Sequence, residues 1–289
     1  MRSKFSNKTE MKTISFVNMK GGVGKTTLAL NVADCLARSH DKKVVVIDVD
    51  PQFNATQCLF TGEEYVNLLK NQADTVLNVF DTDIRPIASV VSGASTHSPK
   101  ELSDITLQKS GQLWVLPGNI DLYRLEMTTG EGREFSLQRL IEENLEPAGF
   151  DFVIIDTPPT PSMWMTSALI ASDYFVIPVK PDPLSLIGID LLRSIIERRR
   201  KSYNLKIKCL GLIFTMVERS DSTIYKTARA NLVKDKYWKN YLFDKYLPKR
   251  TELAKQQLSQ PFILSMDDFD MRSSLTSLVK KLLEQIENG

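Results

Sequence analysis

Short, continuously apolar runs recur along the chain, separated by longer segments in which apolar residues return at helical spacing. Continuous apolar runs are typical of strands that are buried on both faces of a parallel sheet. The predicted strands are residues 14–17, 43–48, 113–116, 152–156, 174–179 and 209–215. Helical periodicity marks residues 28–36, 136–145 and 184–200. The alternation predicts an α/β fold, with a doubly wound and mostly parallel sheet flanked by helices.

The first predicted strand and helix are joined by a glycine-rich run, which reads Lys20-Gly21-Gly22-Val23-Gly24-Lys25-Thr26-Thr27. At a strand-to-helix turn, glycines let backbone N–H groups converge on an anion. In such a loop Lys25 is expected to reach the β- and γ-phosphates of a nucleotide, and Thr26 to ligate Mg²⁺. Met19 stands where an ordinary phosphate-binding loop has its first glycine. The loop is therefore a variant, with Lys20 as an added lysine.

Two predicted strands end in carboxylates, at the edge of a parallel sheet where ligands bind. Asp48 ends the strand at 43–48 and Asp50 follows it by two positions, and Asp156 ends the strand at 152–156. Val49 separates Asp48 from Asp50. We expect the two acids to have different tasks, one serving a metal and the other a water. A strand-end aspartate can hold the waters of an octahedral Mg²⁺ shell, which is the role expected of Asp156. The alternative for Asp50 is a turn cap before a proline.

The loop resembles that of the ParA/MinD family of deviant Walker A ATPases, which has the form Lys-Gly-Gly-x-Gly-Lys-[Thr/Ser]. The similarity continues through the Asp-x-Asp-Pro-Gln and Asp-Thr-Pro-Pro segments and covers about residues 11–288. It implies an ATP-dependent homodimer in which Lys20 reaches the phosphates bound by the partner. It also implies that Asp48 lies near the Mg²⁺ hydration shell and that Asp50 positions or activates the attacking water.

The same resemblance assigns the rest of the nucleotide site. It gives phosphate contacts to the whole loop at residues 20–27 and purine contacts to the neighbourhoods of Met216 and Pro248. Residues 157–161 resemble switch II, the segment that senses the γ-phosphate. The family commonly has Ser-Leu after its two prolines, whereas this chain has Thr160-Pro161-Ser162.

Basic residues are concentrated in one region. Residues 193–255 hold 17 Lys+Arg against 6 Asp+Glu, a net charge of +11, although the whole chain carries only +2. Such a field suits contacts with the DNA backbone without base reading, and the alternative is a solvated helix face. The candidate contacts form two clusters: Arg198, Arg199, Arg200 and Lys201, then Lys226 and Arg229. Only about ten residues precede the first strand, so no helix-turn-helix for operator recognition is expected there.

Several other classes of protein are disfavoured. No apolar run reaches the roughly 18 residues of a membrane span, and the N-terminus lacks the apolar core of a signal peptide. Cys35, Cys58 and Cys209 are not at metal-ligand spacing, which argues against an iron–sulfur protein. The amphipathic tail at 275–287 has two lysines and no aromatic residue, so we expect it to pack on the sheet rather than anchor a membrane.

The sequence predicts a ParA-type partition ATPase, cytoplasmic and nucleoid-associated. ATP and Mg²⁺ would assemble a dimer that binds DNA non-specifically, and a ParB-like or other cargo adaptor would stimulate hydrolysis. Residues 1–10 are expected to be a disordered extension, residues 11–289 a single ATPase domain, and residues 89–111 a surface excursion within it. Two alternatives remain: a MinD-like membrane-associated positioning ATPase, which would sediment with anionic liposomes, and a metabolic P-loop ligase or kinase, which would form a phosphorylated product.

Overall fold

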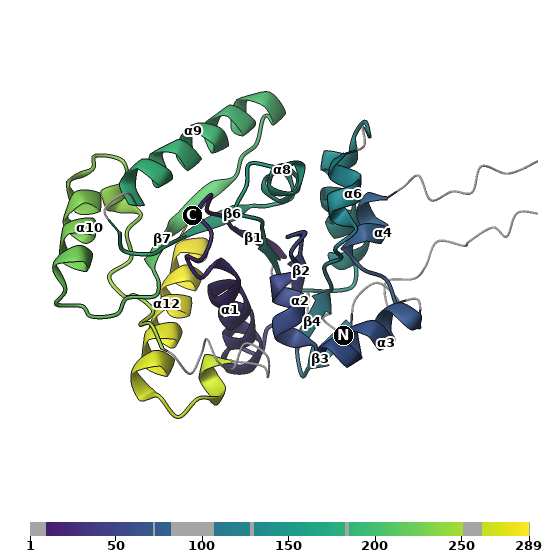
Figure 1. The fold of residues 1–289 in the computed structure, drawn as a ribbon, viewed down its shortest axis with the longest axis horizontal. Coiled ribbons are helices and arrows are strands. Elements are labelled where there is room, and N and C mark those ends of the chain that lie inside the picture. Colours follow the sequence, from purple (N-terminus) through teal and green to yellow (C-terminus); the bar gives the residue numbers. More distant parts are fainter. Residues whose placement is uncertain are drawn as a thin grey trace, which may run out of the picture.

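A single seven-stranded sheet organises the protein, with the strand order β3-β4-β2-β5-β1-β6-β7. The computed structural model describes residues 10–71, 73–81, 107–127, 130–182, 185–250 and 262–288. Within these, all pairs of neighbouring strands are parallel except β3 with β4 at one edge. Figure 1 shows α1 and α12 on one side of the sheet and α8 and α9 on the other. The predicted doubly wound α/β fold is confirmed.

The strands are β1 (Lys12–Phe16), β2 (Val44–Asp48), β3 (Leu107–Ser110), β4 (Leu113–Leu116), β5 (Phe152–Asp156), β6 (Tyr174–Val179) and β7 (Lys208–Phe214). Three of them, β4, β5 and β6, have the predicted bounds. The edge strand β3 was missed, because its residues Leu-Gln-Lys-Ser are half exposed and lack an apolar run. The expectation that residues 89–111 form only a surface excursion is therefore wrong for β3. Residues 1–9 lie outside the described part of the chain, so the predicted N-terminal extension stays a prediction.

The α-helices are α1 (Lys25–Ser39), α2 (Asn54–Leu59), α3 (Gly62–Lys70), α4 (Val76–Phe80), α6 (Leu122–Glu126), α7 (Ser136–Leu140), α8 (Met163–Ile170), α9 (Ser185–Tyr203), α10 (Thr223–Lys234) and α12 (Phe269–Glu287). A π-helical turn, η2 (Ile141–Leu145), continues α7, and the short 3₁₀ turns are η1 (Arg133–Phe135), η3 (Trp238–Asn240) and η5 (Ile263–Ser265). The predicted helix at 136–145 is thus α-helical in its first half and π-helical in its second.

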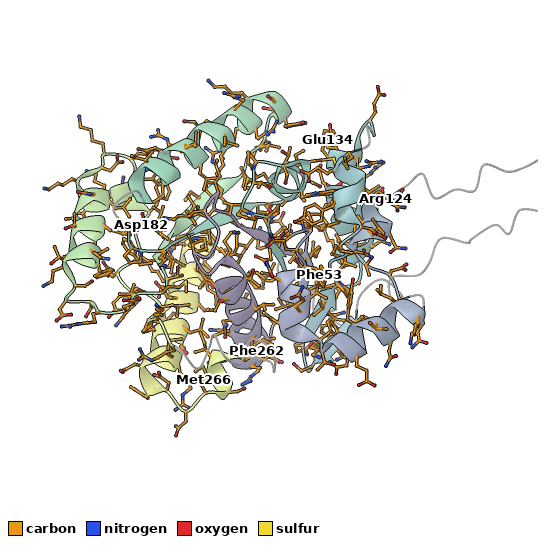
Figure 2. The ribbon with its side chains drawn as sticks, viewed as in Figure 1. Phe53, Arg124, Glu134, Asp182, Phe262 and Met266 are labelled. Atoms are coloured by element: carbon orange, nitrogen blue, oxygen red, sulfur yellow. The ribbon has the colours of Figure 1, made fainter. Side chains whose placement is uncertain are left out.

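The C-terminal helix α12 packs into the protein. Its apolar side chains Met271, Leu275 and Leu278 belong to the same buried cluster as the inner face of α1. Phe262 and Met266, on either side of η5, lie against this cluster and beside α1 and α12 (Figure 2). The expected packing of the tail on the body of the protein is confirmed.

Strand order and register determine where the carboxylates meet. In the parallel pair β2–β5, Asp48 is directly opposite Asp156, and Phe16 of β1 is opposite Asp156 on its other side. The carboxyl ends of β1, β2 and β5 therefore lie side by side. The glycine-rich loop follows β1, so it begins at the same edge of the sheet as both aspartates.

The aromatic residues of the basic region belong to the core. Tyr225 and Trp238 are buried in the cluster between the sheet, α9 and α10. The Trp238 indole N–H donates to Asp190 Oδ1 at 2.9 Å, and the Arg193 guanidinium stacks on the Tyr237 ring. Tyr237 and Trp238 thus tie α9 to the segment that follows α10, and the buried Tyr225 and Trp238 present no face for stacking on bases.

Candidate nucleotide-binding site

The glycine-rich loop adopts a conformation that requires glycine. Gly22 and Gly24 have φ values of 67° and 77°, in the left-handed region that other L-residues rarely adopt. Gly24 is also the N-cap of α1, and its carbonyl accepts the first helical bond from the Leu28 N–H at 2.9 Å. The free N–H groups of the first turn of α1 lie in this loop, which is the usual arrangement for binding a phosphate.

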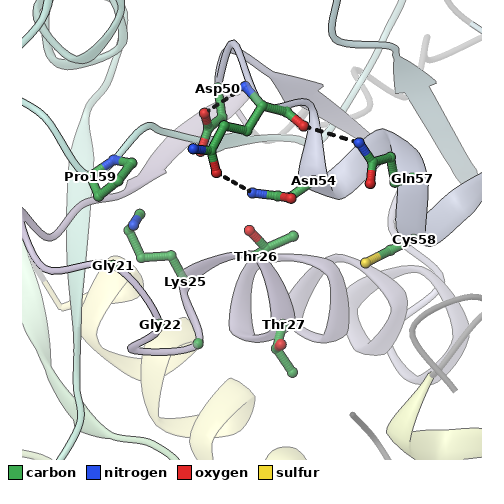
Figure 3. A pocket seen from close by; sticks show the side chains of 12 residues that line it. Gly21, Gly22, Lys25, Thr26, Thr27, Asp50, Asn54, Gln57, Cys58 and Pro159 are labelled. Carbon is green, nitrogen blue, oxygen red and sulfur yellow. Dashed lines mark hydrogen bonds between the residues drawn. The ribbon is translucent and has the colours of Figure 1, made fainter. Parts of the chain in front are cut away.

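The loop borders a pocket of about 400 Å³, large enough for the phosphates of a nucleotide. Figure 3 shows Lys25 and Thr26 pointing from the loop toward Asp50, which comes from the loop after β2. The remaining walls come from α2 and from the turn after β5. The pocket is lined by Gly21, Gly22, Gly24, Lys25, Thr26, Thr27, Asp50, Gln52, Asn54, Gln57, Cys58 and Pro159.

Lys25 carries the main positive charge of the pocket. The residue is only 7% exposed, and this burial lowers the pKa of its ammonium group, while the nearby carboxylates Asp156 and Asp50 act in the opposite direction. A desolvated ammonium interacts more strongly with an anion than an exposed one does. A phosphate oxygen in the pocket would therefore be bound tightly by Lys25.

Thr26 and Asp156 form the part of the site that fits Mg²⁺. The Thr26 hydroxyl donates to Asp156 Oδ2 at 2.6 Å. The other oxygen, Oδ1, is buried and has no hydrogen-bond partner among the described residues, and burial raises the pKa of Asp156 to about 7. An unpartnered buried oxygen beside a hydroxyl ligand suits a hydrated cation, because metal-bound waters would donate to it. The described residues contain no cluster of three or more His, Cys, Asp or Glu for a metal, so phosphates and waters would complete the shell.

Asp48 does not line the pocket, and it ties α2 to the end of β2. It is fully buried, and its Oδ2 accepts from the Thr56 N–H and hydroxyl, both at 2.8 Å. The Thr56 hydroxyl in turn accepts from the Gly118 N–H at 2.7 Å. Burial and the neighbouring Asp156 carboxylate raise the pKa of Asp48 well above its usual range. Asp48 thus links β2, α2 and the loop after β4, and its place near a Mg²⁺ hydration shell stays a prediction.

Asp50 caps a turn and faces the pocket at the same time. The residue is 4% exposed, and its Oδ1 accepts from the Gln52 N–H at 2.9 Å. The turn continues into Phe53, whose φ of 39° is unusual for a non-glycine residue. Burial raises the pKa of Asp50, and the Lys25 charge lowers it. The two interpretations of Asp50 are therefore compatible, since the capping bond holds the carboxylate toward the pocket.

Lys20 lies on the exposed rim of the loop and does not line the pocket. Its side chain is 51% exposed and forms an ion pair with Asp182, which follows β6. The backbone N–H of Lys20 donates to Asn18 Oδ1 at 2.8 Å, and the Asn18 amide donates to the Pro178 carbonyl at 2.7 Å. The loop after β1 is thus fixed to the end of β6. The role of Lys20 between subunits stays a prediction.

The residues proposed for purine contact lie close to the loop. Met216 has a φ of 53°, and a Cβ atom placed on Gly24 would be 3.7 Å from the Met216 Cγ. Val217 forms a β-bridge with Pro248, so Pro248 lies next to the residue after Met216. The structure therefore places Met216 beside the phosphate loop and Pro248 beside the residue after Met216, and their contact with a base stays a prediction.

The six residues proposed for DNA binding fall into two separate places. Arg198 and Lys201 are exposed near the end of α9, whereas Lys226 is exposed in the second turn of α10. Helix α9 follows β6 and ends near the amino edge of the sheet, while α10 begins after the carboxyl end of β7. Arg199 is half-buried on the same stretch of α9. The two clusters therefore do not form one surface.

Two of these six residues, both arginines, are committed to the fold. Arg200 donates to Glu197 Oε1 at 2.8 Å and to the Ile207 carbonyl, which ties the end of α9 to the start of β7. Arg229 donates to the Phe243 carbonyl at 3.1 Å and to Asp244 Oδ1 at 2.8 Å. Both guanidinium groups hold neighbouring segments together, so substituting either one would disturb the structure as well as the surface charge.

Sequence reasoning missed the contribution of α2 to the site. Asn54, Gln57 and Cys58 line the pocket, and the Gln57 amide donates to the Gln52 carbonyl at 3.2 Å. No periodicity marks a helix of six residues. Its position in the sequence could have indicated that α2 lies at the site, since α2 follows shortly after the Asp-x-Asp-Pro-Gln segment.

Comparison with known proteins agrees with this geometry. Residues 11–209 match the family model described as AAA domain (AAA_31), which is more than half of the chain. The chain belongs to this family, in its ParA/MinD group of P-loop ATPases. The prediction from the glycine-rich loop that the chain belongs to the ParA/MinD group is confirmed.

This ParA/MinD-family chain is similar to named partition proteins. The chromosome partitioning protein ParA of Caulobacter vibrioides is 26% identical over 282 residues, which cover 96% of this chain and 94% of the relative. The fold is similar to a structure from Borrelia burgdorferi B31 named as a plasmid partition protein and bound to AMPPNP, with a TM-score of 0.72, 20% identity and coverage of 97% and 99%.

The same fold also occurs in a biosynthetic enzyme. Cobyrinic acid a,c-diamide synthase from Mycobacterium smegmatis, with bound ADP and magnesium, has a TM-score of 0.72 at 21% identity and coverage of 96% of each chain. Identities this low show the fold alone. The resemblance in sequence, rather than the fold, therefore favours the partition branch.

Proposed function

We propose that this chain is a ParA-type partition ATPase that hydrolyses ATP in a cycle of dimerisation and DNA binding. The observation that carries the proposal is the grouping of Lys25, Thr26 and Asp50 around one pocket, with Asp156 hydrogen-bonded to Thr26 and Lys20 exposed on the rim. The alignment with a chromosome partitioning ParA over 96% of this chain supports the same assignment. ATP and Mg²⁺ are the proposed cofactors.

The proposed chemistry is phosphoanhydride hydrolysis by positioning and charge neutralisation. Lys25 would bind the β- and γ-phosphates, and Lys20 of the partner subunit would add a second positive charge. Bound Mg²⁺ would supply further charge neutralisation, with Thr26 as its protein ligand and Asp156 accepting hydrogen bonds from its waters. Asp50 would orient the attacking water toward the γ-phosphate.

Dimerisation would couple this chemistry to DNA. Two chains would meet at the carboxyl edge of the sheet, because the exposed Lys20 lies there. Lys226 stands near the same edge and is exposed, so a dimer would bring two copies of this residue to one side. DNA contacts through Lys226 would then depend on ATP. A ParB-like or other cargo adaptor would stimulate hydrolysis and release the cytoplasmic, nucleoid-associated dimer.

The test of this function is ATP hydrolysis by the purified protein. We expect slow turnover that requires Mg²⁺ and releases free phosphate. Formation of a phosphorylated small molecule in place of free phosphate would replace the proposal with the metabolic ligase or kinase.

The MinD-like alternative lacks support from the C-terminal helix. The apolar face of α12 is buried against α1 and is therefore not free to enter a bilayer. Among the described residues, no helix has the length and hydropathy to cross a membrane. Sedimentation with vesicles of anionic phospholipid tests this alternative, and we expect the protein to stay in the supernatant.

A further inference from the structure

A second group of basic residues gathers at the amino edge of the sheet, at the opposite ends of the strands from the nucleotide pocket. A pocket of about 290 Å³ opens there between β1, β6 and β7. Lys12 of β1, Lys206 before β7 and Lys208 of β7 line this pocket together with Asp173. Three ammonium groups from two strands and one loop thus border the same cavity.

The acidic groups near this pocket are already engaged. Asp173 is the single acid in its lining, and its Oδ2 accepts from the Thr13 N–H at 2.8 Å. Lys12 pairs with the exposed Glu10 at 2.6 Å. An exposed pair of this kind contributes little stability, so a phosphate group could displace Glu10 at small cost.

The end of α9 extends the same surface. Arg200 donates to the carbonyl of Ile207, which is itself part of the pocket wall, so the last turns of α9 are fixed next to the pocket. Arg198 and Lys201 are exposed on those turns. Cations at a helix C-terminus also stabilise the helix dipole, but this does not account for the lysines that stand on β1 and before β7.

We propose that this amino-edge surface, made of Lys12, Arg198, Lys201, Lys206 and Lys208, binds the phosphodiester backbone of duplex DNA. No nucleotide-dependent element lies in it, so it would bind DNA weakly in every nucleotide state. The inference rests on the proposed function for its dimer. Since the two chains would meet at their carboxyl edges, the two amino-edge surfaces would point away from each other. One ATP-bound dimer would then hold two duplexes at once.

The first experiment measures the binding of a labelled duplex at low salt, with ADP and with ATP. The Lys206→Glu/Lys208→Glu variant should bind the duplex about tenfold or more weakly with ADP, because two phosphate contacts become repulsive. A second variant, Arg198→Glu/Lys201→Glu, should show a loss in the same direction. Lys70→Glu, which reverses an exposed charge at the end of α3, is the matched control and should bind as the wild type does.

The second experiment tests for two duplexes on one dimer. Wild-type protein with ATP should capture a labelled duplex on beads that carry an immobilised duplex, and the Lys206→Glu/Lys208→Glu variant should not. Melting curves verify that each variant is folded. The neutral Lys206→Gln/Lys208→Gln variant, which removes attraction without adding repulsion, should show an intermediate loss.

The proposal would be overturned if both double variants bound the duplex with ADP as tightly as the wild type and also captured the labelled duplex on the beads as well as the wild type. A loss of binding to anionic phospholipid vesicles, with binding to the duplex unchanged, would also overturn it and would indicate a membrane surface instead. Failure of the proposed function would give a different result from failure of this proposal. If the protein did not dimerise with ATP, bead capture would be lost, but substituting Lys206 and Lys208 would still weaken the binding of the duplex with ADP.

Discussion

At the scale of single residues, the pocket places the Asp50 carboxylate and the Lys25 ammonium group beside the same space, and both residues are largely buried. The hydrogen bond from the Gln52 N–H holds the Asp50 carboxylate toward this space. Asp50 follows β2 and lines the pocket, so it is the candidate for orienting the attacking water. We expect Asp50→Ala to bind ATP normally but to hydrolyse it about 100-fold or more slowly, because the water-orienting group is lost. Phosphate release and binding of a fluorescent ATP analogue measure the two steps.

The control for Asp50 is Glu63→Ala, which removes an exposed carboxylate from the first turn of α3. This variant should hydrolyse ATP at the wild-type rate. Unchanged hydrolysis in Asp50→Ala would assign the water-orienting role to another residue.

A second residue-scale prediction concerns Asp34, a buried carboxylate in α1. Neither of its oxygens has a hydrogen-bond partner among the described residues, and the nearest charge is Arg38 Nε at 3.7 Å. Burial raises the pKa of Asp34 to about 6, with Arg38 acting in the opposite direction. The folded state thus takes up the proton more readily than the unfolded chain does. This group's contribution to stability is therefore fully present at pH values below about 4 and is lost as the pH rises through about 6.

The Asp34→Asn variant isolates this effect, since asparagine resembles the protonated acid. It should become more stable than the wild type as the pH rises from 4 to 7, by at most about 3 kcal/mol, because a difference of one in pKa corresponds to about 1.4 kcal/mol. Urea unfolding at a series of pH values measures the gap. A gap that stays constant with pH would mean that Asp34 ionises normally in the folded protein.

At the scale of elements, the sequence was sufficient wherever a strand is buried on both faces. The apolar runs of β4, β5 and β6 have no polar position until the strand ends, and their bounds were predicted correctly. The edge strand β3 has one partner strand and a half-exposed, polar sequence, so no apolar pattern marks it. Helix α2 has only six residues, and it was missed for the same lack of periodicity.

The candidate site was predictable where residues are adjacent in sequence, as in the loop at 20–27. The task of Asp48 was not, because it depends on Thr56 and on Gly118, a residue of the loop after a different strand. The separation of Arg198 from Lys226 was equally hidden, since it follows from the direction in which α9 and α10 run. Contacts between distant segments decide both questions.

The contact of Thr56 gives a prediction at this scale, because its hydroxyl joins three elements. Thr56→Val keeps the shape of the side chain but leaves the Gly118 N–H and one Asp48 bond without a partner. We expect a loss of about 1–3 kcal/mol in the free energy of unfolding. Thr56→Ser keeps the hydroxyl and should recover most of the loss in denaturant titrations. Equal stability of the Val and Ser variants would show that methyl packing, rather than the hydrogen bonds, matters at this position.

At the scale of the whole molecule, the account depends on whether two chains assemble around ATP. Lys20→Ala should still bind ATP through Lys25 and Thr26 but should remain monomeric, because the intersubunit contact is lost. Light scattering with ATP and Mg²⁺ measures the mass, and Lys70→Ala, which removes an exposed lysine from the end of α3, should dimerise normally. An ATP-bound dimer of normal stability in Lys20→Ala would refute the arrangement in which Lys20 reaches the phosphates bound by the partner.

The most direct test of the central claim is a titration of duplex DNA at several salt concentrations, with ATP and with ADP. If each half of the dimer contacts about three to five phosphates, the log–log salt slope with ATP should be about −5 to −9. The account predicts that ATP tightens binding at least about tenfold over ADP and that unrelated duplex sequences bind equally well. Equal affinity with the two nucleotides, or indifference to salt, would contradict the account and remove DNA from the mechanism.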